Sequence, residues 1–512
     1  MGASVSSFPA RPEGYNVFSM TLRSPDTIKL MDAPDSVLQL VRDSLVTYYG
    51  EVQDIQRDVE GGTCFQLFGW PFAKNCGFDQ TVQSKYFLTR MVADLYGTGW
   101  KLWLNSDLSR LYDNSTLFFH RVTPPSASFT MSCLSISQSD KFQLINAPES
   151  LYQALTTAVG SLRQSSDVAD NCYVLKMHGN LWDNNNYEES TEARLLLLNV
   201  FRSFRREGYS FFGTVNTKGT ADSIFFIRMD TSLPSEGYCI VSLNSDDRLR
   251  LIECPEPLIQ MTETLLSTRW PGGIQKINRE GACVEFKMTG YPWRARTRED
   301  AVTTRLFLTE LLKEGVAMGW AVLAALDISR KVQDKAIFIM RSCTPARIPH
   351  FCISPGDNDK IRIIGADAEV RGYVADVIRQ CWTPGIQDES IGPLHDHQLK
   401  LCGTPWQCSS SSDSFSLARL MMTRILTALE AIGWSVICSA DVSAKYITER
   451  NYHNRRNNRH PQYIEYGEDV HTWFIAQISA FSTTPSQAAP SAPTEPDAPP
   501  SYNEVVGGQY AS

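Results

Sequence analysis

Short apolar segments recur along residues 237–342 with the length and spacing of β-strands. At residues 249–252 arginine alternates with aliphatic residues, which predicts a strand with one buried and one solvent-facing side. Four further apolar segments of strand length lie at residues 238–242, 283–288, 320–326 and 336–340. This stretch of the chain is therefore expected to form a β-sheet.

Two segments of the same stretch follow helical spacing instead. Pro255 lies near the first turn of a helix that runs to about Thr268. A longer helix begins near Arg298, and Gly319 marks its end. Its apolar side is formed by Leu308, Leu311, Leu312 and Val316. The resulting order, ββαβαββ, predicts an α+β fold in which two helices cover one face of a mostly antiparallel sheet.

Landmarks of this pattern return four times along the chain. A turn of the approximate form Gly-x-Pro-aromatic begins at Gly69, Gly179, Gly290 and Gly403. A glycine followed by Trp or Tyr recurs at Gly99, Gly208, Gly319 and Gly433, and an aspartate recurs at Asp26, Asp140, Asp247 and Asp359. All three series share a period of roughly 110 residues, which is the size of a small domain. We therefore expect four tandem homologous domains.

The repeat spacing also sets the expected domain boundaries. The four repeats are placed at residues 18–122, 129–230, 237–342 and 350–481. The fourth repeat carries an insertion at 445–471. Residues 1–17 are expected to be a flexible N-terminus, and residues 482–512 a disordered proline-rich tail.

The recurring glycine turn has a structural and a functional interpretation. Four aromatic side chains at equivalent loop positions could stack against sugars or bases. The structural interpretation is favoured, because glycine permits a positive φ, proline fixes the next bend, and the aromatic residue packs over the helices. Leu181 replaces the proline in the second repeat, and a shared binding chemistry would tolerate such a change poorly. The recurring aspartate is likewise interpreted as a turn residue.

Composition narrows the classes of partner. The chain has 512 residues, of which 43% are hydrophobic and 20% charged, as in ordinary globular domains. A net charge of -8 argues against nucleic acid as the main partner. The 13 cysteines are scattered without a Cys-x-x-Cys pair, which favours reduced thiols in a cytoplasmic protein. The longest apolar run, residues 316–326, is about half the length of a membrane-spanning helix.

The proline-rich tail contains two short motifs nine residues apart. Pro499-Pro500-Ser501-Tyr502 resembles the ligands of WW domains, including those of HECT-type ubiquitin ligases, and Pro490-Ser491-Ala492-Pro493 resembles the peptides bound by the ubiquitin-variant domain of the ESCRT machinery. The resemblance implies that Pro499, Pro500 and Tyr502 form one contact, and Pro490, Ser491, Ala492 and Pro493 the other. Proline favours the extended polyproline II shape that such grooves bind. The alternative is a solubilising linker.

The other end of the chain matches a lipidation pattern. Met1 is followed by Gly2 and small residues, as N-myristoylation of Gly2 requires. A single acyl chain gives reversible attachment, so the expected location is cytoplasmic with peripheral contact to the plasma or an endosomal membrane. A plain flexible N-terminus is the alternative interpretation.

Two further polar segments could hold a ligand. Arg450, Arg455, Arg456 and Arg459 could contact phosphates of a lipid head group or RNA, although acidic residues follow closely and a solvated loop is the alternative. His395-Asp396-His397 offers half of a metal site without a partner at a known spacing, so no metal or other cofactor is expected. No nucleophile elbow, phosphate-binding glycine loop or zinc-hydrolase helix is visible, and no catalytic residue is predicted.

These observations support a non-enzymatic adaptor or scaffold as the leading hypothesis. Four repeats would hold a cargo, while the tail recruits a WW-domain ubiquitin ligase and an ESCRT component. Two alternatives stay open. One is a ligand-binding or enzymatic repeat protein for a lipid, carbohydrate or other small ligand, with a regulatory tail, which predicts a concave pocket with convergent polar groups. The other is a structural array of the membrane-coat type, which predicts extensive contacts between the repeats.

Overall fold

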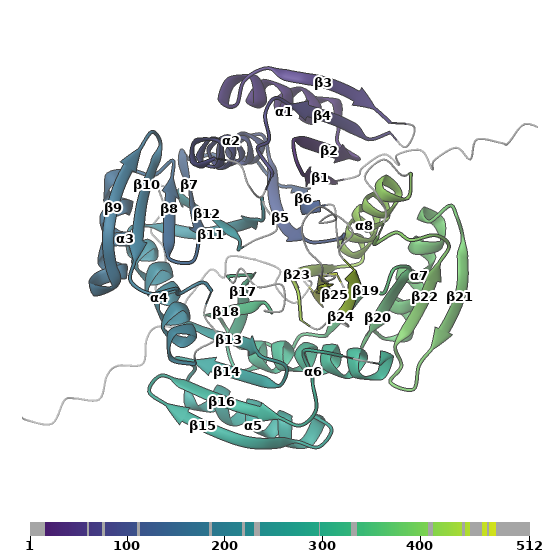
Figure 1. Ribbon diagram of the computed structural model, residues 1–512. Coiled ribbons are helices and arrows are strands. Elements are labelled where there is room, and N and C mark those ends of the chain that lie inside the picture. The colour runs from purple at the N-terminus through teal and green to yellow at the C-terminus, as the bar shows by residue number, and fades with distance from the viewer. Residues whose placement is uncertain are drawn as a thin grey trace, which may run out of the picture.

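The computed structural model shows four repeats arranged in a closed ring (Figure 1). It describes residues 16–477 apart from 59–60, 74–76, 110–112, 184–186, 218–220, 230–235, 296, 329–334, 408–412, 443–445, 451–462 and 468–469. The predicted Gly2 site and both tail motifs lie outside the described residues, as do Arg455, Arg456 and Arg459 of the insertion. No helix in the described part of the chain is long and apolar enough to cross a membrane.

Each repeat is built from six strands and two helices in the same order. Repeat 1 contains β1 (Val17–Arg23), β2 (Thr27–Met31), α1 (Asp35–Tyr48), β3 (Val52–Arg57), β4 (Thr63–Leu67), α2 (Phe78–Gly97), β5 (Trp100–Ser106) and β6 (Asp113–Arg121). Repeat 2 contains β7 (Phe129–Ser137), β8 (Lys141–Ile145), α3 (Glu149–Val159), the short 3-10 helix η1 (Gly160–Leu162), β9 (Arg163–Ala169), β10 (Cys172–Met177), α4 (Tyr187–Arg206), β11 (Tyr209–Val215) and β12 (Ser223–Met229).

The second half of the chain repeats this order. Repeat 3 contains β13 (Tyr238–Asn244), β14 (Arg248–Ile252), α5 (Glu256–Arg269), β15 (Ile274–Glu280), β16 (Cys283–Met288), α6 (Arg298–Ala317), β17 (Trp320–Leu326) and β18 (Ile337–Ser342). Repeat 4 contains β19 (His350–Gly356), β20 (Lys360–Ile364), α7 (Ala368–Cys381), β21 (Ile386–Ile391), β22 (His397–Leu401), α8 (Asp413–Ala431), β23 (Trp434–Ala440) and β26 (Thr472–Gln477). The insertion adds a hairpin of β24 (Tyr446–Arg450) and β25 (Tyr463–Gly467), which lies near the centre of the ring in the view of Figure 1.

The α+β class and the four repeats predicted from sequence are confirmed, with one correction to the element order. Every sheet is antiparallel, and its order in repeat 1 is β3-β4-β2-β1-β6-β5. The predicted order ββαβαββ lacks one strand, and the observed order is ββαββαββ. The missed strands are β3, β9, β15 and β21, which form the outer edge of each sheet. Their side chains are mostly exposed and polar, so they carry no apolar alternation.

Local sequence signals explain where the helices begin. Prolines precede the first helix of repeats 1, 2 and 3, where a missing N–H costs nothing. At α6 the hydroxyl of Thr297 accepts a bond from the N–H of Asp300, and the Asp300 carboxylate accepts one from the N–H of Thr297, both at 3.1 Å. This reciprocal pair is a capping box, and it fixes the start of the helix that packs between repeats 3 and 4.

The second helix of each repeat joins it to the next repeat. Helix α2 packs against β7 and β8, α4 against β13 and β14, and α6 against β19 and β20. Helix α8 packs in the same way against β1 and β2, so the last repeat meets the first and the ring closes. Figure 1 shows the result, with β3, β9, β15 and β21 at the rim and β5, β11, β17 and β23 toward the centre.

Because of this interleaving, both faces of each sheet are buried. Along β1, Phe18 and Met20 pack with α1 and α2, whereas Val17 packs with residues of α8. The predicted half-buried strand at 249–252 is therefore wrong in one respect. Arg250 is only 5% exposed, because its face of the sheet lies against repeat 2 and its guanidinium donates to Ser190 Oγ at 2.6 Å.

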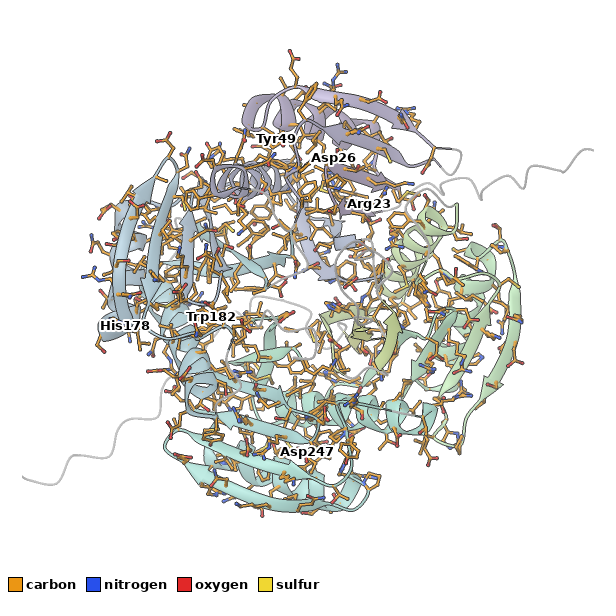
Figure 2. All side chains as sticks on the ribbon, in the orientation of Figure 1. Arg23, Asp26, Tyr49, His178, Trp182 and Asp247 are labelled. Atoms are coloured by element: carbon orange, nitrogen blue, oxygen red, sulfur yellow. The ribbon has the colours of Figure 1, made fainter. Side chains whose placement is uncertain are left out.

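Turn residues occupy the places expected of them. Asp26, Asp140, Asp247 and Asp359 lie in the turns between the first two strands of each repeat. Gly69, Gly179, Gly290 and Gly403 all have φ between 75° and 89°, which only glycine adopts without strain. The aromatic residue three positions later is buried in every repeat, for example Trp293, whose indole N–H donates to the Arg248 carbonyl at 2.9 Å. Figure 2 marks Asp26, Asp247 and Trp182 among the side chains that fill the repeats.

Candidate functional site

The contact surfaces between neighbouring repeats are here called seams. Each seam contains one buried cationic side chain at an equivalent position. Lys85, Arg194, Arg305 and Arg419 occupy the same position on the second helix of their repeats and are at most 5% exposed. Lys85 donates to Ser135 Oγ of repeat 2 at 2.5 Å, and Arg194 to Ser242 Oγ of repeat 3 at 2.7 Å. Each of the four precedes the Gly-aromatic landmark by fourteen residues, a regularity that sequence reasoning passed over.

Two of the four seams are closed by an ion pair at a second shared position. This position follows the second strand of each repeat and holds Asp32, Asn146, Glu253 or Gly365. At the seam between repeats 4 and 1, both carboxylate oxygens of Asp32 contact Arg424, at 2.6 and 2.9 Å. At the seam between repeats 2 and 3, Glu253 pairs with Arg202 of α4. The bidentate Asp32–Arg424 pair and the Glu253–Arg202 pair are partly buried and tie the repeats together through charge as well as packing.

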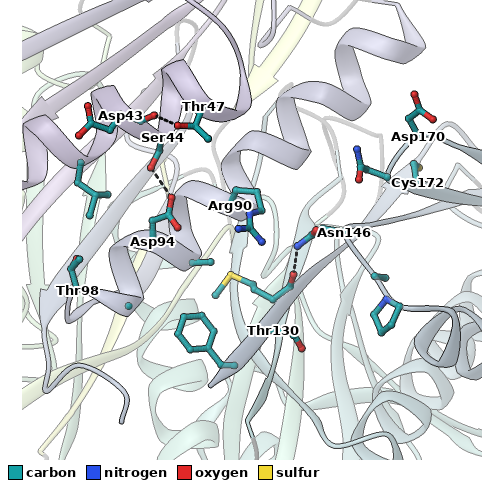
Figure 3. Close-up of a pocket in the computed structure, with 18 of the residues that line it drawn as sticks. Asp43, Ser44, Thr47, Arg90, Asp94, Thr98, Thr130, Asn146, Asp170 and Cys172 are labelled. Atoms are coloured by element: carbon teal, nitrogen blue, oxygen red, sulfur yellow. Dashed lines mark hydrogen bonds between the residues drawn. The ribbon is translucent and has the colours of Figure 1, made fainter. Parts of the chain in front are cut away.

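At the seam between repeats 1 and 2 lies an open cleft of about 1180 Å³ (Figure 3). One wall is formed by α1 and α2, which contribute Asp43, Arg90 and Asp94. The opposite wall comes from β7, the turn at Asn146 and the hairpin between β9 and β10. The cleft thus sits where two other seams carry their ion pair, and its walls come from two different repeats.

Arg90 is the cation of this cleft. Its guanidinium lies 5.0 Å from the centre of the Tyr48 ring and donates to the Tyr48 hydroxyl at 3.3 Å. That hydrogen bond raises the pKa of Arg90, so the side chain stays charged. Its Nε–H has no acceptor among the residues that the structure describes, and no described carboxylate forms an ion pair with it. Arg90 corresponds in position to Arg424, which does have a carboxylate partner.

The rest of the cleft is acidic at its rim and unreactive at its base. Asp94 accepts a hydrogen bond from Ser44 at 2.8 Å, and the exposed residues Asp43 and Asp170 also line the cleft (Figure 3). Burial raises the pKa of the Cys172 thiol to about 11, so it is not a thiolate at neutral pH. Hydrogen-bond donors, acceptors and a fixed cation on a concave surface suit this cleft to binding rather than to nucleophilic chemistry.

A second, smaller cleft of about 480 Å³ lies at the equivalent seam between repeats 3 and 4. Here Glu310 replaces Arg90 and Gly365 replaces Asn146. The Glu310 carboxylate is paired with Lys313 on the same helix at 3.1 Å. The two clefts therefore have opposite charge at the same structural position, and only the larger one presents an arginine there.

The predicted candidates do not converge on either cleft. In His395-Asp396-His397, Asp396 pairs with Arg298 of repeat 3 at 2.6 Å, and His397 Nε2 lies 2.6 Å from Glu389. The segment is therefore part of a seam, and the described residues hold no group of three or more metal-ligating side chains. Arg450 lies on β24, apart from the cleft-lining residues. Neither Arg90 nor Asn146 was predicted, since each becomes a site residue only through the neighbouring repeat.

Comparison with known proteins agrees with the internal repetition. A single domain-family model matches the chain four times, at residues 16–120, 130–231, 237–341 and 349–475. The description of that family is of a domain and states no activity, ligand or partner. No curated protein matches the chain.

Proposed function

This chain belongs to the domain family whose model matches all four of its repeats, and from that premise we propose that it is a non-enzymatic adaptor. The ring of repeats acts as a rigid body that holds a cargo. The proline-rich tail recruits a WW-domain ubiquitin ligase, and its second motif recruits an ESCRT component. The observation that carries the proposal is the position of both motifs at residues 490–502, beyond the last strand of the last repeat, which ends at Gln477.

Several physical features support an adaptor over an enzyme. Each repeat uses its second helix to pack against the next sheet, so the side chains at equivalent positions serve the seams. The thiols of Cys133, Cys352 and Cys438 are buried and have raised pKa values, which makes them poor nucleophiles. A tail of six prolines between residues 485 and 500 has an extended preference of its own and needs little ordering on binding.

Binding of the tail to a WW domain tests this proposal. Titration of a WW domain with a peptide of residues 482–512 is expected to give saturable binding, because Pro499, Pro500 and Tyr502 supply the proline pair and the amphipathic anchor. Tyr502→Ala is expected to weaken binding at least tenfold, while Tyr510→Ala in the same peptide serves as the matched control. Equal affinity of the Tyr502→Ala and unchanged peptides would refute recruitment through this motif.

The second motif is tested separately with an ESCRT ubiquitin-variant domain. Pro490→Ala and Pro493→Ala are expected to abolish its binding to the tail peptide, and Pro485→Ala is the control. In cells, proximity labelling with the full chain and with a chain ending before Ser482 then shows whether ligase and ESCRT components depend on the tail. Unchanged labelling after truncation would contradict the adaptor role.

Membrane attachment through Gly2 is part of the proposal and has its own measurement. Mass spectrometry of the N-terminal peptide is expected to show loss of Met1 and addition of a fourteen-carbon acyl group at Gly2. Because one acyl chain binds membranes reversibly, Gly2→Ala is expected to shift the protein from the membrane to the soluble fraction. An unmodified Gly2 would remove the lipid anchor and leave a cytoplasmic adaptor.

The alternative is a ligand-binding repeat protein whose tail regulates turnover, and the cleft between repeats 1 and 2 favours it. That interpretation requires a concave surface with convergent polar groups, and the cleft of about 1180 Å³ has both. The two functions are compatible, because a cargo or a small ligand in the cleft leaves the tail accessible. They differ in outcome: loss of the tail should abolish ligase recruitment but leave cleft binding intact.

A further inference from the structure

The position after the second strand of each repeat is used differently at each seam. Asp32 fills it between repeats 4 and 1 and pairs with Arg424. Glu253 fills it between repeats 2 and 3 and pairs with Arg202, which lies three residues beyond the position equivalent to Arg424 on its helix. Between repeats 1 and 2, Arg90 is the residue equivalent to Arg424. The position of Asp32 is taken there by Asn146, whose side chain is a neutral amide. The Arg424–Asp32 pair therefore shows how an arginine at this position binds a carboxylate.

Asn146 does not replace the missing acid. Its side-chain amide donates to the carbonyl of Met131 at 2.8 Å, within its own repeat. Its φ of 53° matches the 56° of Asp32, so the two side chains leave equivalent backbones. Arg90 is left with the Tyr48 hydroxyl as its one acceptor among the described residues, and it faces a cleft large enough for several residues of a peptide.

We propose that the cleft between repeats 1 and 2 binds a carboxylate-bearing ligand, with Arg90 as the residue that receives the carboxylate. A charge-assisted contact from a guanidinium to both carboxylate oxygens is the geometry that Arg424 and Asp32 already adopt. The inference concerns the repeats alone and stands apart from the recruitment proposal, since no residue of the tail takes part in it.

The rim of the cleft adds a second requirement on the ligand. Asp43, Asp94 and Asp170 line the same cleft and disfavour a ligand that carries several negative charges. A ligand with one carboxylate and a nearby ammonium or guanidinium group fits both features. The chemical class is therefore zwitterionic, and its source is either a free amino acid or a peptide segment in which an acidic residue lies close to a basic one.

The test uses the full chain and two probes that distinguish these sources. Free alanine and a capped Ala-Glu-Ala-Lys-Ala peptide, each with one carboxylate and one ammonium group, are titrated by calorimetry at constant ionic strength, with the corresponding Gln peptide as the comparison that lacks the carboxylate. We expect saturable binding of at least one carboxylate probe and at least a tenfold weaker binding in Arg90→Gln, because the charge-assisted hydrogen bonds from the guanidinium to the carboxylate are lost. Arg57→Gln is the matched control, since Arg57 is an exposed arginine of the same repeat.

A second variant supplies the carboxylate from within the chain. Asn146→Asp is expected to pair with Arg90 as Asp32 pairs with Arg424, to raise the Tm and to abolish binding of both probes. Binding of alanine alone assigns a small ligand, and binding of the peptide alone assigns a protein segment. The proposal is overturned if neither probe binds the unchanged protein, or if Arg90→Gln and Asn146→Asp bind the probes as well as Arg57→Gln does.

Discussion

At the scale of single residues, two titratable groups have strongly shifted pKa values. Asp222 is 7% exposed and accepts a bond from the N–H of Asp327 in the next repeat at 2.8 Å. Burial raises the pKa of Asp222 to about 7. Burial lowers the pKa of His471 to about 4, since the charged imidazolium loses its hydration. The two groups therefore oppose each other in how stability depends on pH.

Asp222 is expected to make the protein less stable as the pH rises from about 4 to 7. In this window the unfolded chain has lost the proton while the folded protein keeps it, so stability is fully present below the unfolded pKa and is lost as pH rises through the folded pKa. The shift corresponds to about 4 kcal/mol in the free energy of unfolding. Asp222→Asn retains an acceptor for the Asp327 N–H and is expected to abolish this part of the pH dependence.

Urea unfolding at several pH values measures the effect. The difference between Asp222→Asn and the unchanged protein is the useful quantity, because the opposite contribution of His471, which is lost as the pH falls from 6.5 toward 4, is present in both. Asp54→Asn, at an exposed position on β3, is the matched control. A difference that stays constant with pH would show that Asp222 titrates normally.

At the scale of elements, α8 carries the contacts that close the ring. It buries Arg424 against Asp32, and Thr423 donates to Ser19 of β1 at 3.1 Å. Ser416 of the same helix accepts a hydrogen bond from Lys29 of β2. No linker connects repeat 4 to repeat 1, so side-chain contacts such as these and the apolar packing around them hold that seam together.

Removal of the Asp32 carboxylate is therefore expected to be costly. Asp32→Asn leaves Arg424 buried without its counter-ion and should lower the free energy of unfolding by about 3–5 kcal/mol. The control is Asp35→Asn, three residues away, which breaks the exposed pair with Arg57 and should cost less than about 1 kcal/mol. Urea unfolding of both variants provides the comparison. Similar losses in the two would contradict a specific role for the Arg424 pair.

The elements also show which parts of the fold can be predicted from the sequence. Inner strands such as 238–242 were predicted because their apolar residues are continuous or alternate, and α6 because its apolar residues recur at helical spacing. The outer strand β15 was missed because its residues Ile274–Glu280 are mainly polar and exposed, as an edge strand at the rim can be. The burial of the Arg250 side chain was not predicted, because residues of repeat 2 cover it.

At the scale of the whole molecule, the ring has four equivalent seams but only three linkers. Residues 122–128 connect β6 to β7, and corresponding segments connect repeats 2 to 3 and 3 to 4. The described part of the chain begins beside β6 and ends beside β19: the Arg121 N–H donates to the Asn16 carbonyl, and the Gln477 N–H to the Pro349 carbonyl. The candidate cleft likewise exists only in the assembled ring, because Arg90 belongs to repeat 1 and Asn146 to repeat 2. Neither residue forms a site within its own repeat.

This pseudo-fourfold arrangement predicts that the chain tolerates circular permutation. A variant that joins Gln477 to Asn16 through about eight Gly and Ser residues and opens between residues 124 and 125 should keep the fold, because exposed linkers tolerate new termini. Thermal unfolding and small-angle scattering are the measurements. A permutant opened at Leu308 inside α6 is the matched control and should not fold. If the linker permutant also fails to fold, the order of the repeats along the chain matters beyond their packing.

The unlinked seam also determines how the molecule responds to mechanical load. The first described strand, β1, and the last, β26, belong to the two repeats that meet through the contact between α8 and the first sheet. A force that pulls the two ends of the chain apart acts across this contact, whereas the other three seams are bridged by peptide linkers. The Arg424–Asp32 pair and its apolar surroundings would therefore yield first, and the ring would open into a linear array of four intact domains.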